Sequence, residues 1–262
     1  MKRRLFALAF FLVLNACAVA PRALTPSAEA TPTRVAVSTP GVGPKFINHT
    51  PPPYTVNMTP FQNVKCPPPG NASGECDPNN PLASFGCDEI QKPSDALGAL
   101  NPSFPIVLCF VVPARRPDHQ EPPPGSYLYR QGGLLGMYAR YLIQRDNEFQ
   151  VLQTPEELKN TFAPIESPDE ALAYAIAVKG LDAVYGLKYE PGYAYSVDVI
   201  EDSFARPDGD GYVVRLFHFR MFGCGPHEMV AFDLRVSRDG TIQDVAQQAM
   251  YRDPKMDGLC ID

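Results

Sequence analysis

The chain has 262 residues, of which 45% are hydrophobic and 20% are charged. This length allows one globular domain or two, and no apolar stretch is long enough to span a membrane. The formal net charge is −6, and three of the positive charges lie at residues 2–4. The acidic balance argues against a nucleic-acid partner, because that binding depends on clustered lysine and arginine.

The two halves of the chain differ in proline content, since 22 of the 29 prolines lie between Pro21 and Pro124. The Pro-poor remainder has the hydrophobic patterning of a compact domain. We therefore expect four regions in chain order, which are a signal peptide (1–16), a lipidated cysteine with a disordered tether (17–45), a Pro-rich disulfide-containing extended segment (46–124) and an α+β globular domain (125–262).

The amino-terminal leader has three basic residues at 2–4 followed by an apolar core at 5–14. Such a short core is typical of a secretory signal rather than of a spanning helix. The sequence Leu-Asn-Ala-Cys at 14–17 resembles the lipobox of bacterial lipoprotein precursors. This resemblance implies that Cys17 is acylated, becomes the first residue and anchors the protein in a lipid bilayer. Ordinary cleavage after Ala18 is the alternative.

The residues after Cys17 indicate which membrane holds the protein and how the globular part is attached to its anchor. In lipoproteins of bacteria with two membranes, an aspartate after the cysteine causes retention in the inner membrane. Ala18 stands there in this chain, so the resemblance implies the outer membrane in such a cell. Residues 18–45 are rich in Pro, Thr, Ser and Ala and lack bulky side chains, which predicts a disordered tether.

Export changes the interpretation of the six other cysteines, because disulfides persist in oxidising compartments. Their even number predicts three disulfides. Their positions favour a bridge between Cys224 and Cys260, with two more among Cys66, Cys76, Cys87 and Cys109. No CxxC motif and no histidine pair at ligand spacing is present, so we expect no metal site and no cofactor.

The first regular elements are expected from residue 106 onward. An apolar run at 106–112 bounded by prolines predicts a strand within an otherwise loop-rich layer. Residues 137–144 and 148–153 flank a polar turn and predict a hairpin. Thr154 and Ser167 are each followed by proline and, three residues on, by glutamate, which predicts two capped helices.

The second helix is expected to end at Gly180, and four strands follow it. These strands are expected at 193–201, 212–222, 228–237 and 241–251. The 228–237 strand alternates between apolar and mixed residues, as in a sheet with one covered face. The fold class is therefore α+β, with an antiparallel sheet curled around one main helix as a roll, preceded by a Pro-rich, disulfide-pinned loop layer. In topology alone it resembles cystatin-like, PepSY-like and nuclear-transport-factor-like rolls.

Residues 222–227, Phe-Gly-Cys-Gly-Pro-His, form the most distinctive short motif. It is similar to the CGPC redox motif but has no second sulfur, so a structural disulfide is favoured. We expect the turn to expose His227, which makes this residue a candidate for ligand binding or general-base chemistry. A second histidine and four acidic residues are its candidate partners, which are His218, Asp198, Glu201, Asp202 and Glu228. Their spacing does not supply three metal ligands, and we assign no catalytic residue.

Two further motifs have ordinary structural explanations as well as functional ones. The Asp-Gly-Asp-Gly sequence at 208–211 is similar to part of a calcium loop, but a hairpin turn is favoured because the required glutamate is absent. Tyr193 and Tyr195 belong to a tyrosine-rich stretch and are candidate ligand-binding residues. The alternative is that these side chains line the edge of the core.

These features favour a membrane-anchored extracytoplasmic lipoprotein that acts as a binding or interaction module of the cell envelope. Its expected partners are the bilayer, through acylated Cys17, and an envelope protein or glycan. Two alternatives remain open. One is an extracytoplasmic enzyme that uses His227 with nearby carboxylates, and the other is a purely structural envelope component.

Overall fold

The computed structural model describes residues 43–62, 82–116 and 118–262. The expected signal peptide, Cys17, Cys66 and Cys76 lie outside these residues. Within the described part, no helix is both long and apolar enough to cross a membrane.

The first sheet is antiparallel and is built around the long strand β5 (Met137–Arg145). One edge of β5 pairs with β3 (Ile106–Val111), and β3 pairs with β2 (Glu89–Gln91). The other edge pairs with β4 (Tyr129–Gln131) and with β6 (Glu148–Leu152), the second arm of the expected hairpin. The Pro-rich segment therefore contributes two strands to a sheet that it shares with the chain beyond residue 125.

Two helices follow, α1 (Pro155–Phe162) and α2 (Pro168–Lys179), and both begin as expected. The Thr154 hydroxyl accepts a hydrogen bond from the Glu157 amide, and the Glu157 carboxylate accepts one from the Thr154 amide in return. The Ser167 hydroxyl caps α2 in the same way through the Glu170 amide. Helix α2 ends at Gly180, whose φ of 63° is the left-handed conformation that glycine adopts at lowest cost.

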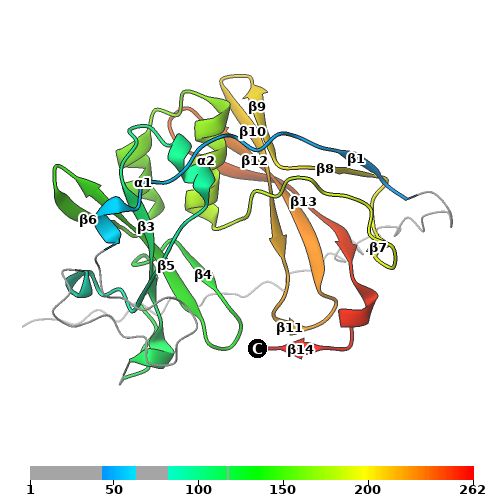
Figure 1. The fold of residues 1–262 in the computed structure, drawn as a ribbon, viewed down its shortest axis with the longest axis horizontal. Coiled ribbons are helices and arrows are strands. Elements are labelled where there is room, and N and C mark those ends of the chain that lie inside the picture. Colours follow the sequence, from blue (N-terminus) through cyan, green and yellow to red (C-terminus); the bar gives the residue numbers. More distant parts are fainter. Residues whose placement is uncertain (1–42, 63–81, 117) are drawn as a thin grey trace, which may run out of the picture. The chain divides into compact units, whose positions relative to one another are not determined.

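The second sheet curves around α2 in the strand order β7-β13-β12-β10-β9 (Figure 1). Its strands are β7 (Ala194–Tyr195), β9 (Phe204–Asp208), β10 (Gly211–Phe219), β12 (Glu228–Ser237) and β13 (Ile242–Arg252). Alternate residues of β10 and β12 project toward α2, as the sequence pattern of β12 predicts. The α+β roll, with one antiparallel sheet curled around one main helix, is thereby confirmed.

Helix α2 is buried on most of its surface, because both sheets contribute to one core around it. Tyr141 of β5, Leu152 of β6, Leu216 of β10 and Leu234 of β12 belong to the same cluster as the alanine-rich body of α2. The small side chains of that helix permit close packing on several faces at once.

Shorter elements complete the fold. Strand β1 (Lys45–Ile47) pairs in parallel with β8 (Val199–Glu201), and β11 (Gly223–Cys224) pairs with β14 (Cys260–Ile261). Among the described residues, short 3-10 helices lie at Thr59–Phe61, Ala83–Phe85, Asp95–Ala99, Pro113–Arg115 and Pro254–Met256.

The predicted bridge between Cys224 and Cys260 is present, and a second disulfide joins Cys87 to Cys109. The expected strand at 193–201 is interrupted and forms β7 and β8. Strand β9 was not expected, because Pro207 and its exposed neighbours lack the apolar alternation of a half-buried strand.

Candidate functional site

A cleft of about 390 Å³ opens between the end of α2 and strands β12 and β13, within the size range of ligand sites. Its lining combines apolar and polar side chains, contributed by Lys179, Leu181, Phe232, Asp244, Val245, Ala246 and Gln247. The cleft lies on the side of the curled sheet that faces α2, since Phe232 pairs directly with the inward-facing Leu216.

Strand β13 borders the cleft, and along most of its length the side of this strand away from β12 is not paired with another described strand. On the side away from β12, β13 pairs with β7 only at Tyr251 and Arg252. No other described strand covers that edge, so the backbone from Ile242 to about Ala249 faces outward. A β-bulge opposite Asp233 and Leu234 leaves Val245 without a cross-strand partner, and 61% of this residue is exposed.

An ion pair between Lys179 and Asp244 lines the polar side of the cleft. The Lys179 Nζ lies 2.7 Å from Oδ1 of Asp244 and joins the last turn of α2 to β13. A cation at this end of a helix is also favoured by the helix dipole. The cleft can therefore offer a ligand an apolar floor, unpaired strand backbone and one pair of opposite charges.

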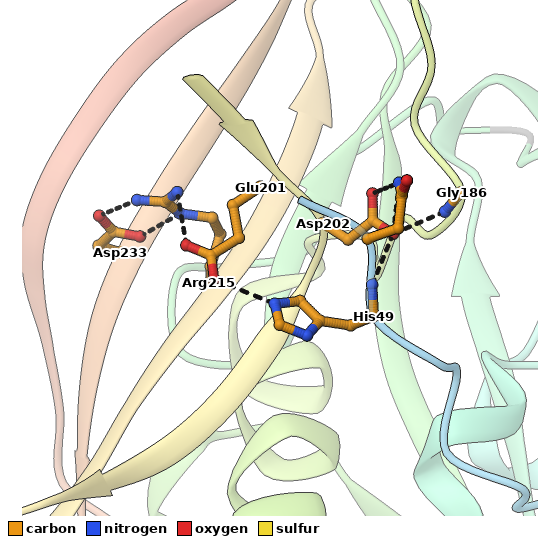
Figure 2. A network of polar contacts seen from close by, with 7 residues as sticks. His49, Gly186, Glu201, Asp202, Arg215 and Asp233 are labelled. Atoms are coloured by element: carbon orange, nitrogen blue, oxygen red, sulfur yellow. Dashed lines mark hydrogen bonds and ion pairs between the residues drawn. The ribbon is translucent and has the colours of Figure 1, made fainter. Parts of the chain in front are cut away.

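A polar network lies on the opposite face of the same sheet (Figure 2). Arg215 of β10 binds Asp233 of β12 through two contacts of 2.7 Å, from Nε to Oδ1 and from Nη2 to Oδ2. The Arg215 Nη1 also lies 3.7 Å from Oε2 of Glu201, whose Oε1 is 3.0 Å from Nε2 of His49. His49, which is 38% exposed in its side chain, thus lies at the end of a chain of polar contacts that runs from Asp233 through Arg215 and Glu201.

Asp202 fixes the segment that carries His49. This carboxylate is fully buried and accepts hydrogen bonds from the amides of His49 at 3.1 Å, Gly186 at 2.7 Å and Leu187 at 3.0 Å. The Asn48 side chain donates to it as well, at 3.1 Å. These donors stabilise a buried negative charge that forms no ion pair among the described residues. Asp202 therefore joins three separate segments and is not available as a ligand-binding group.

A smaller pocket of about 200 Å³ adjoins His49. Its lining includes Asp169 from the first turn of α2 and the ring of Tyr185. Burial raises the pKa of Tyr185 to about 12, and the carboxylates of Asp169 and Asp202 add to this shift. The pocket thus places an imidazole, a carboxylate and a protonated phenol within one small space.

The expectation that the turn exposes His227 is wrong. Only 1% of this residue is exposed, because Leu259 and the β14 segment cover it. Its Nδ1 lies 3.2 Å from the Arg220 carbonyl and its Nε2 lies 3.2 Å from the Leu259 carbonyl. Both ring nitrogens face backbone carbonyls, and a ring N–H can donate a hydrogen bond there, so His227 is packed between the turn and the C-terminal segment.

His218 is exposed near the end of β10. His218 interacts electrostatically with Asp182. Burial raises the pKa of the Asp182 carboxyl, and the interaction with His218 partly offsets this rise. The four acidic residues proposed as partners of the two histidines are not brought together, since Glu201 pairs with His49 and Glu228 pairs with Arg220. Within the described residues, no group of three or more His, Cys, Asp or Glu side chains is placed to hold a metal ion.

Tyr193 and Tyr195 lie in a tyrosine cluster beside β7. Tyr193 stacks on Tyr251 with ring centroids 5.5 Å apart, and Tyr189 stacks on Tyr195 at the same distance. Tyr195 also bonds through its hydroxyl to the Glu190 amide at 2.7 Å. Tyr189 and Tyr193 are 53% and 37% exposed, so the cluster forms part of the surface as well as the edge of the core.

Sequence reasoning did not identify the cleft or the role of His49. His49 and Glu201 are 152 positions apart, so no local spacing connects them. Strand β13 agrees with the expected strand at 241–251, and its run of polar and small residues is typical of a strand that lacks a covered outer edge. No protein-family model matches this chain, and neither the curated proteins nor the solved structures contain a significant match to it.

Proposed function

We propose that this chain is an extracytoplasmic lipoprotein, held to a bilayer by acyl chains on Cys17, that acts as a binding module of the cell envelope. The lipobox resemblance at residues 14–17 supports the anchor. The two disulfides support an oxidising compartment, since such bridges are rare in reducing cytosol. An outer-membrane location follows for a cell with two membranes.

The cleft beside β13 is the main observation in favour of a binding role. An uncovered strand edge can pair with an extended peptide through main-chain hydrogen bonds, while a neighbouring cleft selects its side chains. Val245, Phe232 and Leu181 supply apolar surface next to that edge. We therefore propose that the ligand is an extended segment of another envelope protein, with a glycan as the competing class.

Site-specific photo-crosslinking in intact cells tests this proposal. A benzoylphenylalanine replaces Val245, and the matched control places it at Asp146, which is 91% exposed in its side chain in the β5–β6 turn. We expect a discrete protein adduct from position 245 and none from position 146. Mass spectrometry then identifies the crosslinked peptide of the partner. Identical adduct patterns at both positions would contradict a ligand site at the cleft.

A charge at the strand edge provides the second arm of the test. Val245→Lys should lower the yield of the adduct formed from a probe at Gln247 about tenfold, because an edge lysine discourages strand pairing. Asp146→Asn, which raises the net charge by one as Val245→Lys does, is the control for a change of charge alone. Since Val245 is largely exposed, equal melting temperatures of the two variants would exclude unfolding as the cause.

A second candidate function, an extracytoplasmic enzyme, is favoured by the His49–Glu201 hydrogen bond beside the smaller pocket. A carboxylate that orients an imidazole is a common arrangement for a general base. Incubating the protein with fractionated envelope glycans and peptides, and comparing it with His49→Ala by mass spectrometry, tests this candidate. Conversion that is lost in His49→Ala supports it, and conversion that is equal in both proteins contradicts it.

A further inference from the structure

Two loops bring exposed large apolar side chains together at one end of the molecule. Leu134 and Leu135, in the β4–β5 connection, are 78% and 68% exposed. Met221 and Phe222, between β10 and β11, are 42% and 47% exposed. We refer to these four residues as the apolar tip.

The two loops touch, so the apolar tip is one surface. A Cβ atom on Gly133 would lie only 2.8 Å from Cδ1 of Phe222, which shows how closely the first loop approaches the second. Glycine is needed at this position for that approach. The β4–β5 hairpin and the β11–β14 pair lie beside each other in Figure 1, in agreement with this contact.

Both loops of the apolar tip are fixed, the first by a hydrogen bond and the second by a disulfide and strand pairing. The Arg130 Nη2 donates a hydrogen bond of 2.6 Å to the Gly133 carbonyl. The second loop runs directly into β11, which the Cys224–Cys260 disulfide and the pairing with β14 fix. A rigid exposed cluster of large apolar residues is characteristic of a surface that becomes buried against a partner.

The amino-terminal chain indicates which partner this is. Cys17, the proposed acylation site, is separated from Gly43, where the described structure begins, by only about 26 residues, which could extend about 80 Å at about 3.1 Å per residue. Such a tether holds the domain permanently within reach of the bilayer in which it is anchored. The Arg130 side chain and the Asp262 backbone both adjoin Gly133, so polar groups border the apolar tip, as in a surface that lies at the interface between lipid and water.

We propose that the apolar tip inserts into the interface of the same bilayer that holds the acylated Cys17, so that the domain docks on the membrane surface. This inference rests on the proposed lipid anchor. Insertion of the tip gives the domain a second membrane contact beside the acyl chains, and two signals anchor a protein far more stably than one.

The absence of tryptophan from the sequence permits a direct test. Leu135→Trp places the only tryptophan of the protein in the tip, and Val199→Trp, at an exposed residue of β8 that lines neither pocket, is the control. Each acylated protein is purified from membranes and reconstituted into phosphatidylcholine vesicles with brominated acyl chains. We expect at least twofold stronger quenching and a bluer emission for tryptophan 135 than for the control.

A third variant tests the residues of the tip. Quenching of Met221→Trp should fall to the level of the control when Leu134→Ser and Leu135→Ser are added. Failure of the proteins to float with vesicles would overturn the anchor and the docking together. Flotation with equal quenching of both tryptophans would overturn the docking alone. A blue shift without quenching, accompanied by crosslinked dimers, would assign the tip to a second copy of the chain and likewise contradict docking on lipid.

Discussion

The Arg215 guanidinium and the Asp233 carboxylate face each other across β10 and β12, with both nitrogen–oxygen contacts at 2.7 Å. The hydrogen bonds to Asp233 are the main cause of the raised pKa of Arg215. Through Glu201, the same guanidinium connects the sheet to His49 on the amino-terminal segment. The pair therefore supports both the strand register and the position of the network on this face.

Removing one partner of this pair should destabilise the fold measurably. Because both side chains are largely buried, we expect Asp233→Ala to lower the free energy of unfolding by about 2 kcal/mol. Asp208→Ala is the control, since its ion pair with Arg235 is 3.8 Å long and exposed and should contribute less than about 0.5 kcal/mol. Urea unfolding measures both values. Equal losses would show that burial and geometry do not strengthen the Arg215 pair.

The end of α2 should not tolerate a side chain at Gly180. The added Cβ of Gly180→Ala would overlap the ring of Tyr129, in addition to the strain of an alanine at φ 63°. We expect a loss of about 3 kcal/mol, from about 1 for the backbone and about 2 for overpacking. Gly186→Ala, at φ 70° with no atom within 4 Å of the new Cβ, isolates the backbone contribution and should cost about 1 kcal/mol. A similar loss in both variants would argue against close packing of Tyr129 on Gly180.

The helix boundaries show which parts of the fold a sequence can predict. Thr154, Ser167 and Gly180 act through residues within four positions, and each of them does what its local pattern indicates. By contrast, the pairing of β3 with β5 and the contacts of His49 join segments that are distant in the sequence. The burial of His227 also depends on a contact between distant parts of the sequence, because Leu259, which lies against it, is 32 positions away.

Four tyrosines that folding removes largely from solvent should make stability fall in alkaline solution. Burial is the first cause that raises the pKa to about 12 for each of them, namely Tyr129, Tyr174, Tyr185 and Tyr251. An unfolded chain ionises these phenols near pH 10, so it binds fewer protons than the folded protein between about pH 10 and about pH 12. The free energy of unfolding therefore decreases with pH across that interval.

Ultraviolet titration of phenolate measures this effect. The native protein should show a late group of ionisations near pH 12, and protein in urea should titrate entirely near pH 10. Tyr185→Phe should remove one late ionisation and reduce the dependence of stability on pH. Complete titration of the native protein near pH 10, with its circular dichroism unchanged, is the contrary outcome.

The disulfide between Cys224 and Cys260 should stabilise the C-terminal end of the sheet. It closes a loop with a sequence separation of 36, which predicts a loss of about 4 kcal/mol when both cysteines become alanine. Hydrogen exchange should increase first at Glu228 and Arg220, beside the buried His227. His227→Phe keeps the bridge but removes the imidazole hydrogen bond to the backbone, and should cost about 1 kcal/mol. Unchanged exchange in the cysteine variant would contradict this role.

Intact mass spectrometry of the protein isolated from native membranes, before and after reduction, tests the central claim most directly. We expect a chain that begins at Cys17, carries acyl chains and gains on reduction the hydrogens of three disulfides. An unprocessed Met1 with free thiols on a protein from the cytosolic fraction would contradict the account.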